Sequence, residues 1–586
     1  MSETESWAAR RTRWMNRFHA RRARLSNPAR GFLSQPEPRT IGAYARGRQL
    51  TEGKFLFAGF LVETEDEGIW DLPVPDARFE AALHGFSWLD DLAAAGDALA
   101  QKRAQDWTHE WVSRFSGGRG PGWTPELTGR RLVRMTSNGV MLLNGADSAR
   151  SRAFFRALGR QVVFLRRRWR AAPAGLPRFE ALTGLLYGAL ALEGLERHVG
   201  VASRALGREC SAVIGASGSL PSRSPEDLLE VFTLLNWAAA ALADVGRMPA
   251  EEHYEAIERI APVLRRLRHS DGGLARFHGG GRGLEGRLEH ALATSGIRAA
   301  GTDGLAMGYA RLAEGRTTVI MDAAPPPEGE TSVNAHASTL AFEMTSGRRP
   351  IVVNCGSGTT FGDSWHQAGR ATPSHSTVGI DGYSSSRLGP GRLWSGRRVE
   401  MLVETPKNVK FILREGATGP HVIASHDGYL ATHGLTHVRT LELSRDGRSL
   451  DGSDVLSPQG ETAQRRFDLA FDRSRLAGIP ITARFHLHPD DDARVDLGGS
   501  AVSIALRSGE IWVFRFSGPA RLGLEPSVYL EKTALTPRAT QQIVLHAAAM
   551  EYTTRLDWSF AKAQETPTYL RDFETDEADG EFAVSG

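Results

Sequence analysis

The sequence of 586 residues contains only two cysteines, Cys210 and Cys355, which lie far apart. A disulfide framework is therefore not expected, and a metal cluster built on thiolates is excluded. Long apolar runs are also missing, since no stretch of about 18 apolar residues occurs and the first residues lack the core and cleavage site of a secretory signal. We therefore expect neither a transmembrane helix nor export by a standard signal.

A strong excess of charge of one sign is absent as well. The chain has 71 Lys and Arg against 68 Asp and Glu, which gives a net charge of +3. Nothing in this balance calls for a nucleic-acid partner, although local groups of arginines suit an anionic partner. Hydrophobic content of 41% and charged content of 24% are ordinary for a soluble globular protein. The length predicts two or more large domains.

Arginines gather near the N-terminus, where aromatic and apolar residues recur at near-helical spacing. The pattern is consistent with a basic amphipathic helix that lies on an anionic membrane surface. A terminal helix docked on its own domain, or a disordered arm, explains the same residues. The residues of the pattern are Trp7, Arg10, Arg11, Arg13, Trp14, Arg17, Phe18, Arg21, Arg22, Arg24 and Leu25.

The first half of the chain shows apolar residues at steps of three and four, which predicts helices. The helix over 225–245 has a clear start, because Ser224 is a good N-cap and Pro225 suits the first helical position. A glycine-rich tract at 278–283 lacks the flanking residues of a phosphate-binding loop. The other predicted helices cover 79–99, 153–170, 177–199 and 249–268.

After about residue 298 the pattern changes to short alternating runs that are rich in β-branched residues and are separated by Gly, Pro, Asp and Asn. Helices followed by strands predict a multidomain α+β protein whose second half is an antiparallel β-sandwich. We divide the chain into a basic arm (1–50), a helical domain (51–297) and a β-sandwich (298–586). The predicted strands cover 317–321, 340–344, 351–354, 376–380, 399–403, 409–413, 438–443, 481–486, 502–506, 510–516 and 542–546.

Two strand motifs, 334–356 and 370–378, bring histidines and paired polar residues together. With the segments 83–91 and 222–225, they resemble the heparinase II/III family of polysaccharide lyases. The resemblance implies an N-terminal (α/α) toroid, a C-terminal β-sandwich and a substrate cleft between them. It also implies β-elimination on a uronic-acid-containing glycan, which needs a group that neutralises the carboxylate, a base and an acid.

On the toroid, the resemblance places an Asn-His pair at Asn138 and Gly139, so that the amide is kept and the imidazole is lost. Asn138 is a candidate for holding a substrate carboxylate, and a helix cap or turn is the structural alternative. The family's tyrosine shortly after Arg-Ser-Pro is replaced near Asp227. Arg223, just before a helix, is a candidate catalytic residue as a carboxylate anchor, or else a structural tie between loops.

On the sandwich, the family's His-x-His pattern reads Asn334-Ala-His336, and the resemblance implies a catalytic His336 and a substrate contact at Asn334. It also implies a zinc site at His336, His375 and the position of Asn354, where relatives carry an aspartate. A neutral amide oxygen is a poor zinc ligand, which speaks against the metal. The alternative is that the two histidines hold the strand motifs together. Zinc is thus the one cofactor that the family suggests.

Because the family's residues are replaced at these positions, other polar loop residues become candidates for the acid, the base or the substrate contacts. His269 and Tyr383 are candidate catalytic residues, and Asp271, His278 and Arg370 are candidate substrate contacts. Each of them is equally well explained as an ordinary loop or core residue.

The helix 153–170 carries several arginines and a tryptophan, among them Arg166 and Trp169. An arginine paired with an aromatic ring suits an acidic sugar chain through bidentate contacts and stacking. It would also suit RNA, but no nucleic-acid-binding fold surrounds it. A solvated arginine face is the structural alternative.

We therefore expect a polysaccharide lyase that acts on an anionic glycan, with no nucleic-acid partner and with membrane contact through the N-terminus. A catalytically degenerate protein for glycan binding or envelope assembly is the first alternative, because the expected histidine and tyrosine positions are substituted. A glycoside hydrolase on the toroid, using two of Asp227, Glu230 and Asp271, is the second. The expected compartment is the cytoplasm or the inner-membrane face, with the periplasm as alternative.

Overall fold

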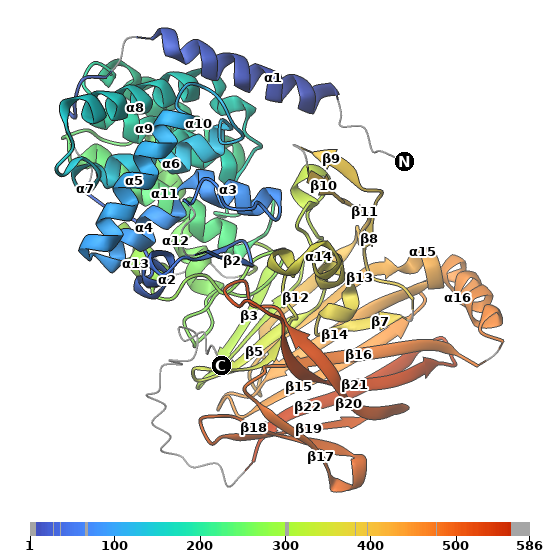
Figure 1. Cartoon of the computed structure of the whole chain (residues 1–586). Coiled ribbons are helices and arrows are strands. Elements are labelled where there is room, and N and C mark those ends of the chain that lie inside the picture. Colours follow the sequence, from blue (N-terminus) through green and yellow to red (C-terminus); the bar gives the residue numbers. More distant parts are fainter. Residues whose placement is uncertain are drawn as a thin grey trace.

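The computed structural model describes residues 7–26, 29–34, 37–64, 68–298, 304–380, 382–394, 397–475 and 477–563. Helices make up its first half and antiparallel strands its second, as the sequence predicts (Figure 1). No helix in these ranges combines the length and the apolar character that a membrane crossing requires.

The helical domain is preceded by α1 (Trp7–Arg22), which lies across its surface beside α8 (Figure 1). A short hairpin of β1 (Lys54–Phe57) and β2 (Phe60–Glu63) lies between α2 and α3. The helices of the domain are α2 (Tyr44–Thr51), α3 (Ala77–Gly85), α4 (Ser87–Ala95), α5 (Ala98–Arg114), α6 (Pro125–Ser137), α7 (Gly139–Leu143), α8 (Ser148–Arg168), α9 (Leu176–Ala191), α10 (Val199–Val213), α11 (Pro225–Ala243), α12 (Glu251–Arg266) and α13 (Arg287–Ser295).

Two boundaries show how local sequence sets these helices. The predicted start of α11 is confirmed, because the Ser224 side chain accepts a hydrogen bond from the backbone N–H of Asp227 and Pro225 occupies the first turn. The single helix predicted over 79–99 is wrong. Phe86 takes a left-handed conformation, with φ of 64°, and separates α3 from α4.

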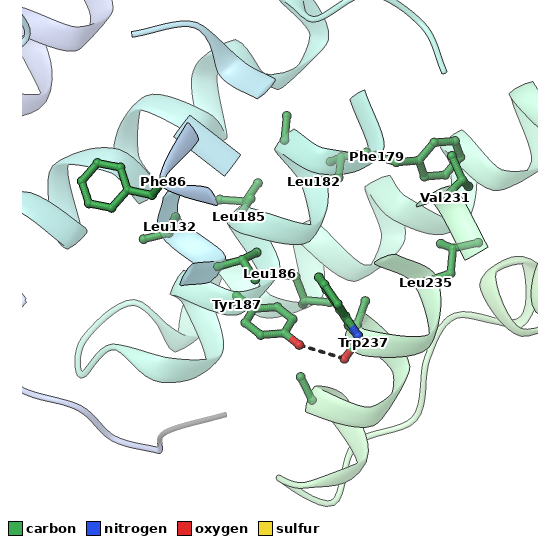
Figure 2. Packing of buried hydrophobic residues seen from close by; sticks show 14 of the residues in the cluster. Phe86, Leu132, Phe179, Leu182, Leu185, Leu186, Tyr187, Val231, Leu235 and Trp237 are labelled. Atoms are coloured by element: carbon green, nitrogen blue, oxygen red, sulfur yellow. Dashed lines mark hydrogen bonds between the residues drawn. The ribbon is translucent and has the colours of Figure 1, made fainter. Parts of the chain in front are cut away.

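Helix α9 forms the centre of the helical domain and is buried on all sides from Phe179 onward. Its residues Leu182, Leu185 and Leu186 pack among α6 and α11, as Figure 2 shows. The Tyr187 hydroxyl donates to the Trp237 carbonyl oxygen at 3.4 Å, so its polar end is satisfied inside the core (Figure 2). A helix apolar on all faces must be enclosed by its neighbours, which fixes the domain around α9.

Helices α6 and α9 touch backbone to backbone. A Cβ added to Gly184 would lie 2.4 Å from the Cα of Gly129, so neither position has space for a side chain. Such close approach is a physical requirement for glycine at this crossing.

Two eight-stranded antiparallel sheets face each other in the β-domain. One has the order β12-β13-β14-β15-β22-β19-β18-β17, and the other β20-β21-β16-β6-β5-β4-β3, with β7 paired to β16. Aromatic side chains fill the space between them: the rings of Phe342 and Trp558, one from each sheet, stack at 5.5 Å between centroids. This is the sandwich that the sequence predicts.

The long strands are β3 (Tyr309–Glu314), β4 (Thr317–Asp322), β5 (Phe342–Ser346), β6 (Arg349–Val353), β12 (Val409–Glu415), β13 (Pro420–Tyr429), β14 (Leu435–Leu443), β15 (Ser449–Ser457), β16 (Ile479–Leu487), β17 (Asp492–Asp496), β18 (Ala501–Ala505), β19 (Ile511–Ser517), β20 (Ala520–Tyr529), β21 (Arg538–Ala549) and β22 (Thr554–Lys562). Shorter elements are β7 (Val378–Ile380), β8 (Arg387–Leu388), β9 (Arg392–Trp394), β10 (Arg397–Val399), β11 (Leu402–Glu404), α14 (Asp363–Arg370), α15 (Leu430–His433) and α16 (Glu461–Arg473). The predicted boundary at 297/298 falls between α13 and β3.

Candidate functional site

Arg223 joins the two domains. It precedes α11 with a φ of 49°, and its Nη2 donates to Asp322 Oδ1 of β4 at 2.6 Å. Its remaining N–H groups donate to carbonyl oxygens of the chain, those of Met307, Gly308, Ala324 and Pro325. With five N–H groups and five acceptors, the guanidinium has no donor left for a substrate carboxylate. The geometry therefore supports the structural alternative for Arg223.

Asp322 is shared by three side chains. Besides Arg223, it accepts a hydrogen bond from the Ser338 hydroxyl at 2.8 Å and lies 3.4 Å from His278 Nε2. Asp322 is fully buried, and although burial raises a carboxyl pKa, the Arg223 guanidinium and His278 hold the pKa of Asp322 well below its usual range. A permanent negative charge thus lies between the two domains.

In both His278 and His336, one ring nitrogen accepts a hydrogen bond from a backbone N–H group. His278 Nδ1 accepts from the backbone N–H of His336, and His336 Nε2 accepts from the backbone N–H of Gly279, both at 3.1 Å. Each ring therefore carries its proton on the other nitrogen, which for His278 faces Asp322. Burial lowers the pKa of both imidazoles. Neither ring offers a lone pair to a substrate proton.

The residues at the family's zinc position do not fit a zinc ion. His375 is fully buried, and its ring packs against His336 with 5.1 Å between centroids. His336 Nε2 is already an acceptor for Gly279. Asn354 donates to Glu343 at 3.2 Å and accepts from the Ser376 N–H at 3.1 Å. Over the described ranges, no group of three or more His, Cys, Asp or Glu residues is placed to hold a metal.

His269 lies in a second buried polar group, against Glu343. Its Nε2 is 3.3 Å from Glu343 Oε2, which also accepts from the backbone N–H of Arg276. Asp271 accepts from the Gly273 N–H at 2.9 Å in a local turn. Together they line a cavity of about 20 Å³, the size of a single water molecule. This space is too small for a sugar ring.

The other predicted site residues lie apart from this cluster. All the N–H donation found for the Arg370 guanidinium goes to carbonyl oxygens of Ser332, Ala335 and Glu400. Tyr383 is 41% exposed and packs edge-to-face on His433 of α15. Trp169 is buried and covered by the Arg170 guanidinium at 4.4 Å, so it presents no open stacking platform. Two more positions are exposed, Arg166 on α8 and Asn334 beside Gly279.

Asn138 connects α6 to α7 and serves as a helix cap. Its Nδ2 donates to the Arg134 carbonyl oxygen at 3.1 Å, and the side chain is 7% exposed. At Gly139, an added Cβ would lie 2.5 Å from the ring of Phe32, which fills the space that a histidine would need. The packing around Gly139 therefore leaves no space for the imidazole expected at this position from the family resemblance.

Sequence reasoning missed a group of ion pairs on α6, α9 and α11, one of which joins α11 to the β-domain. The pairs are Arg130 with Glu180 at 2.6 Å, Glu230 with Arg287 at 2.7 Å, and Glu226 with Lys532 from the loop after β20. Charged residues on otherwise apolar helices are the sequence signal for this group, but only the fold shows which of them meet.

Asp227 lies beside this group of ion pairs and has a shifted pKa. Burial raises the pKa of Asp227 to about 6, against the opposing effect of Lys532. Asp227 and Glu230 are three residues apart on α11, so they lie on one side of that helix. A hydrolase needs two carboxyl groups on opposite sides of the bond, which this pair does not provide.

Comparison with known proteins agrees with this fold. Residues 297–559 match the family model described as heparinase II/III-like, C-terminal. The chain is 30% identical over 546 residues to FtsZ-localized protein C of Caulobacter vibrioides, covering 91% of each protein.

Solved structures of lyases share the architecture. Heparinase III superposes with a TM-score of 0.65 at 13% identity, covering 94% of this chain and 89% of that one. The heparan sulfate lyase HepC from Pedobacter heparinus gives 0.53 at 13% identity, covering 95% of this chain and 89% of that one. At this identity the likeness concerns the fold alone. The fold, the match to the family model and the relative that covers 91% of the chain together establish that the chain belongs to the heparinase II/III-like family.

Proposed function

We propose that this protein has lost the elimination chemistry of the heparinase fold and acts as a membrane-associated assembly protein in cell division. The observation that carries the proposal is that backbone N–H groups donate hydrogen bonds to the basic ring nitrogens of His278 and His336. The name of the relative FtsZ-localized protein C supports the cellular context.

Each part that elimination needs has another task here. Arg223 is saturated by carbonyl oxygens and Asp322, Asn138 caps a helix, and a histidine at Gly139 would collide with Phe32. Asp227 and Glu230 are partly exposed acids with raised pKa values, but two neighbouring carboxyl groups on one helix do not supply the group that neutralises a substrate carboxylate.

This group of charges also suits an acidic polysaccharide poorly. Its cations Arg130, Arg287 and Lys532 are already paired with carboxylates, and Asp227 adds a negative charge when it is ionised. A polyuronate would meet repulsion there. If this part of the protein binds a glycan, the glycan is therefore of low negative charge.

Membrane association is proposed from α1. Trp7, Trp14, Phe18 and Leu25 are 74%, 62%, 43% and 87% exposed. At about 100° per residue Trp7, Trp14 and Phe18 fall on one line of α1, with arginines on both flanks, and Leu25 lies in the short 3₁₀ helix that follows. The opposite side is buried, where Asn16 accepts from Arg168 of α8 at 2.7 Å. Exposed aromatics between arginines are what an anionic bilayer surface binds.

This function places the protein at the cytoplasmic face of the inner membrane. A fluorescent fusion expressed from its native promoter tests the location: a mid-cell band supports the proposal, and uniform periplasmic signal contradicts it.

The catalytic part is tested by following the ultraviolet absorbance of unsaturated uronate, with heparinase III as positive control and a panel of acidic polysaccharides. We expect no product from the wild-type protein. We also expect the wild-type protein to co-sediment with purified FtsZ polymers. Product formation with any substrate refutes the loss of chemistry, and an Asp227→Asn variant then shows whether that carboxyl group is responsible.

The membrane part is tested by flotation with vesicles of phosphatidylglycerol and phosphatidylcholine. Trp14→Ser should weaken binding about tenfold, because burial of a large apolar side chain contributes about 1.5–3 kcal/mol. Met248→Ser is the matched control, since Met248 is 83% exposed and lies outside α1. Equal binding by both variants would refute docking through this helix.

A further inference from the structure

A basic groove lies between α5 and α8, away from the interdomain ion pairs. Its volume is about 520 Å³. The lining residues follow helical spacing on both sides, so each helix presents one face to it. They are His109, Val112, Ser113 and Ser116 from α5 and its end, and Ala149, Arg150, Ala153, Arg156 and Arg160 from α8.

No acidic residue is among those lining residues. Over the described part of the chain, no ion pair is found for Arg150, Arg156 or Arg160, whereas the neighbouring Arg114 is paired with both Asp71 and Glu110. Like charges close together repel unless an anion lies between them.

The polar groups inside the groove are weakly engaged. Arg160 Nη1 reaches the carbonyl and hydroxyl oxygens of Ser116 only at 3.4 Å each. His109 binds the Gln105 carbonyl oxygen through Nδ1 at 2.7 Å, and its Nε2 is buried without a hydrogen-bond partner in the described structure. Burial and the charges of Arg24 and Arg156 lower the pKa of Arg160. A bound anion would complete the hydrogen bonds of Arg160 and offset the repulsion among the arginines.

The groove borders the C-terminal end of α1. A Cβ added to Gly118 would lie 2.6 Å from the backbone of Ala20, and one added to Gly117 would lie 4.0 Å from Arg24 Nε. The loop after α5 thus packs on the end of the helix proposed to face the membrane. The groove therefore lies near the end of the helix that is proposed to bind the membrane.

We infer that the groove between α5 and α8 is a binding site for a phosphate group, supplied by the headgroup of an anionic phospholipid. The source of the phosphate group rests on the proposed membrane docking. The preference for a phosphate group rests on the residues of the groove alone.

Phosphate fits the groove better than a single carboxylate does. Arginine side chains bind phosphate oxygens in bidentate fashion, and several of them here surround one space together with serine hydroxyls. The volume exceeds that of a phosphate ion and lies in the range of small-molecule sites, which leaves room for the rest of a headgroup. Val112, Ala149 and Ala153 offer an apolar wall for its carbon atoms.

Soluble probes test the chemistry of the groove. We expect inorganic phosphate and glycerol 1-phosphate to raise the Tm of the full chain, and the double variant Arg150→Gln, Arg156→Gln to abolish that rise. Both arginines are exposed, so the variant should fold normally. Arg208→Gln is the control, because Arg208 is an exposed arginine of α10 outside the groove.

Vesicles of phosphatidylglycerol and phosphatidylcholine test the source. We expect the double variant to bind about 25-fold more weakly than wild type, from about fivefold per arginine, which corresponds to about 1 kcal/mol each. Arg208→Gln should change binding less than twofold. Trp14→Ser, in contrast, should weaken vesicle binding about tenfold and keep the response to inorganic phosphate.

The outcomes separate the two proposals. Vesicle binding that is unchanged in the double variant, with no response to inorganic phosphate, overturns the groove site and leaves docking through α1 intact. A phosphate response without vesicle binding by the wild-type protein overturns membrane docking and makes free phosphate esters the source of the ligand.

Discussion

Replacement of Arg223 by methionine should destabilise the protein strongly, although the residue looks like a substrate anchor in the sequence. The change keeps an unbranched side chain and removes a charge that is 2.6 Å from the fully buried Asp322. Loss of one partner of a buried ion pair costs about 3–5 kcal/mol, because the other charge stays buried without compensation. The carbonyl oxygens of Met307, Gly308, Ala324 and Pro325 lose their donor as well.

Urea denaturation, followed by tryptophan fluorescence and far-ultraviolet circular dichroism, measures the effect, with the two probes compared because a chain of two domains need not unfold in one step. Asp322→Asn and the double variant complete a double-mutant cycle, in which the double variant should lose less than the sum of the single losses. Arg494→Met is the control, since its pair with Asp492 is largely exposed and contributes about 0–1 kcal/mol. A loss below about 1 kcal/mol for Arg223→Met, or strict additivity, would refute the buried-pair account.

The same pair predicts a dependence on pH. The folded-state pKa of Asp322 lies below the usual value of about 3.9. Its contribution to stability is therefore complete above that value and is lost as the pH falls below it, because protons then favour the unfolded chain. Asp322→Asn should flatten this acid limb of the stability profile, which a series of urea midpoints at falling pH would show.

Three further outcomes follow from other parts of the structure. Gly139→His should lower the free energy of unfolding by about 1–3 kcal/mol through its clash with Phe32 and give no lyase activity; Phe32→Ala in the same chain should recover part of the loss in urea midpoint. Asp227→Asn should raise the Tm near neutral pH and have no effect below about pH 4, because a folded-state pKa of about 6 penalises the ionised form only above the ordinary value of 3.8. Zinc or a chelator should leave the Tm unchanged, as His336 and His375 do not form a metal site with a third ligand; a zinc-dependent rise in Tm would contradict this.

Much of the fold was predictable because local patterns and tertiary structure agree. The cap at Ser224 and the alternating runs of β14 and β16 are strong local signals. The prediction missed β15 and five other long strands, which are β3, β13, β17, β20 and β22. Strand β15 carries Asp, Ser and Gly, which disfavour strands, and it forms because β14 and β22 pair with it on both sides. Its Gly452 is also required by tertiary packing, since an added Cβ would lie 2.2 Å from Trp558.

The sequence by itself determined the order of helices and strands, the family resemblance, the loss of imidazole at Gly139 and the amphipathic pattern of α1, since these depend on residue type and spacing. Only the tertiary structure decided what His336, Arg223 and Arg370 do, because a side chain's role depends on the groups that it meets. Backbone N–H groups and carbonyl oxygens from distant segments take up their hydrogen bonds. The interdomain ion pairs and the basic groove depend on elements that meet only after folding, and spacing along one chain does not reveal which elements will face each other.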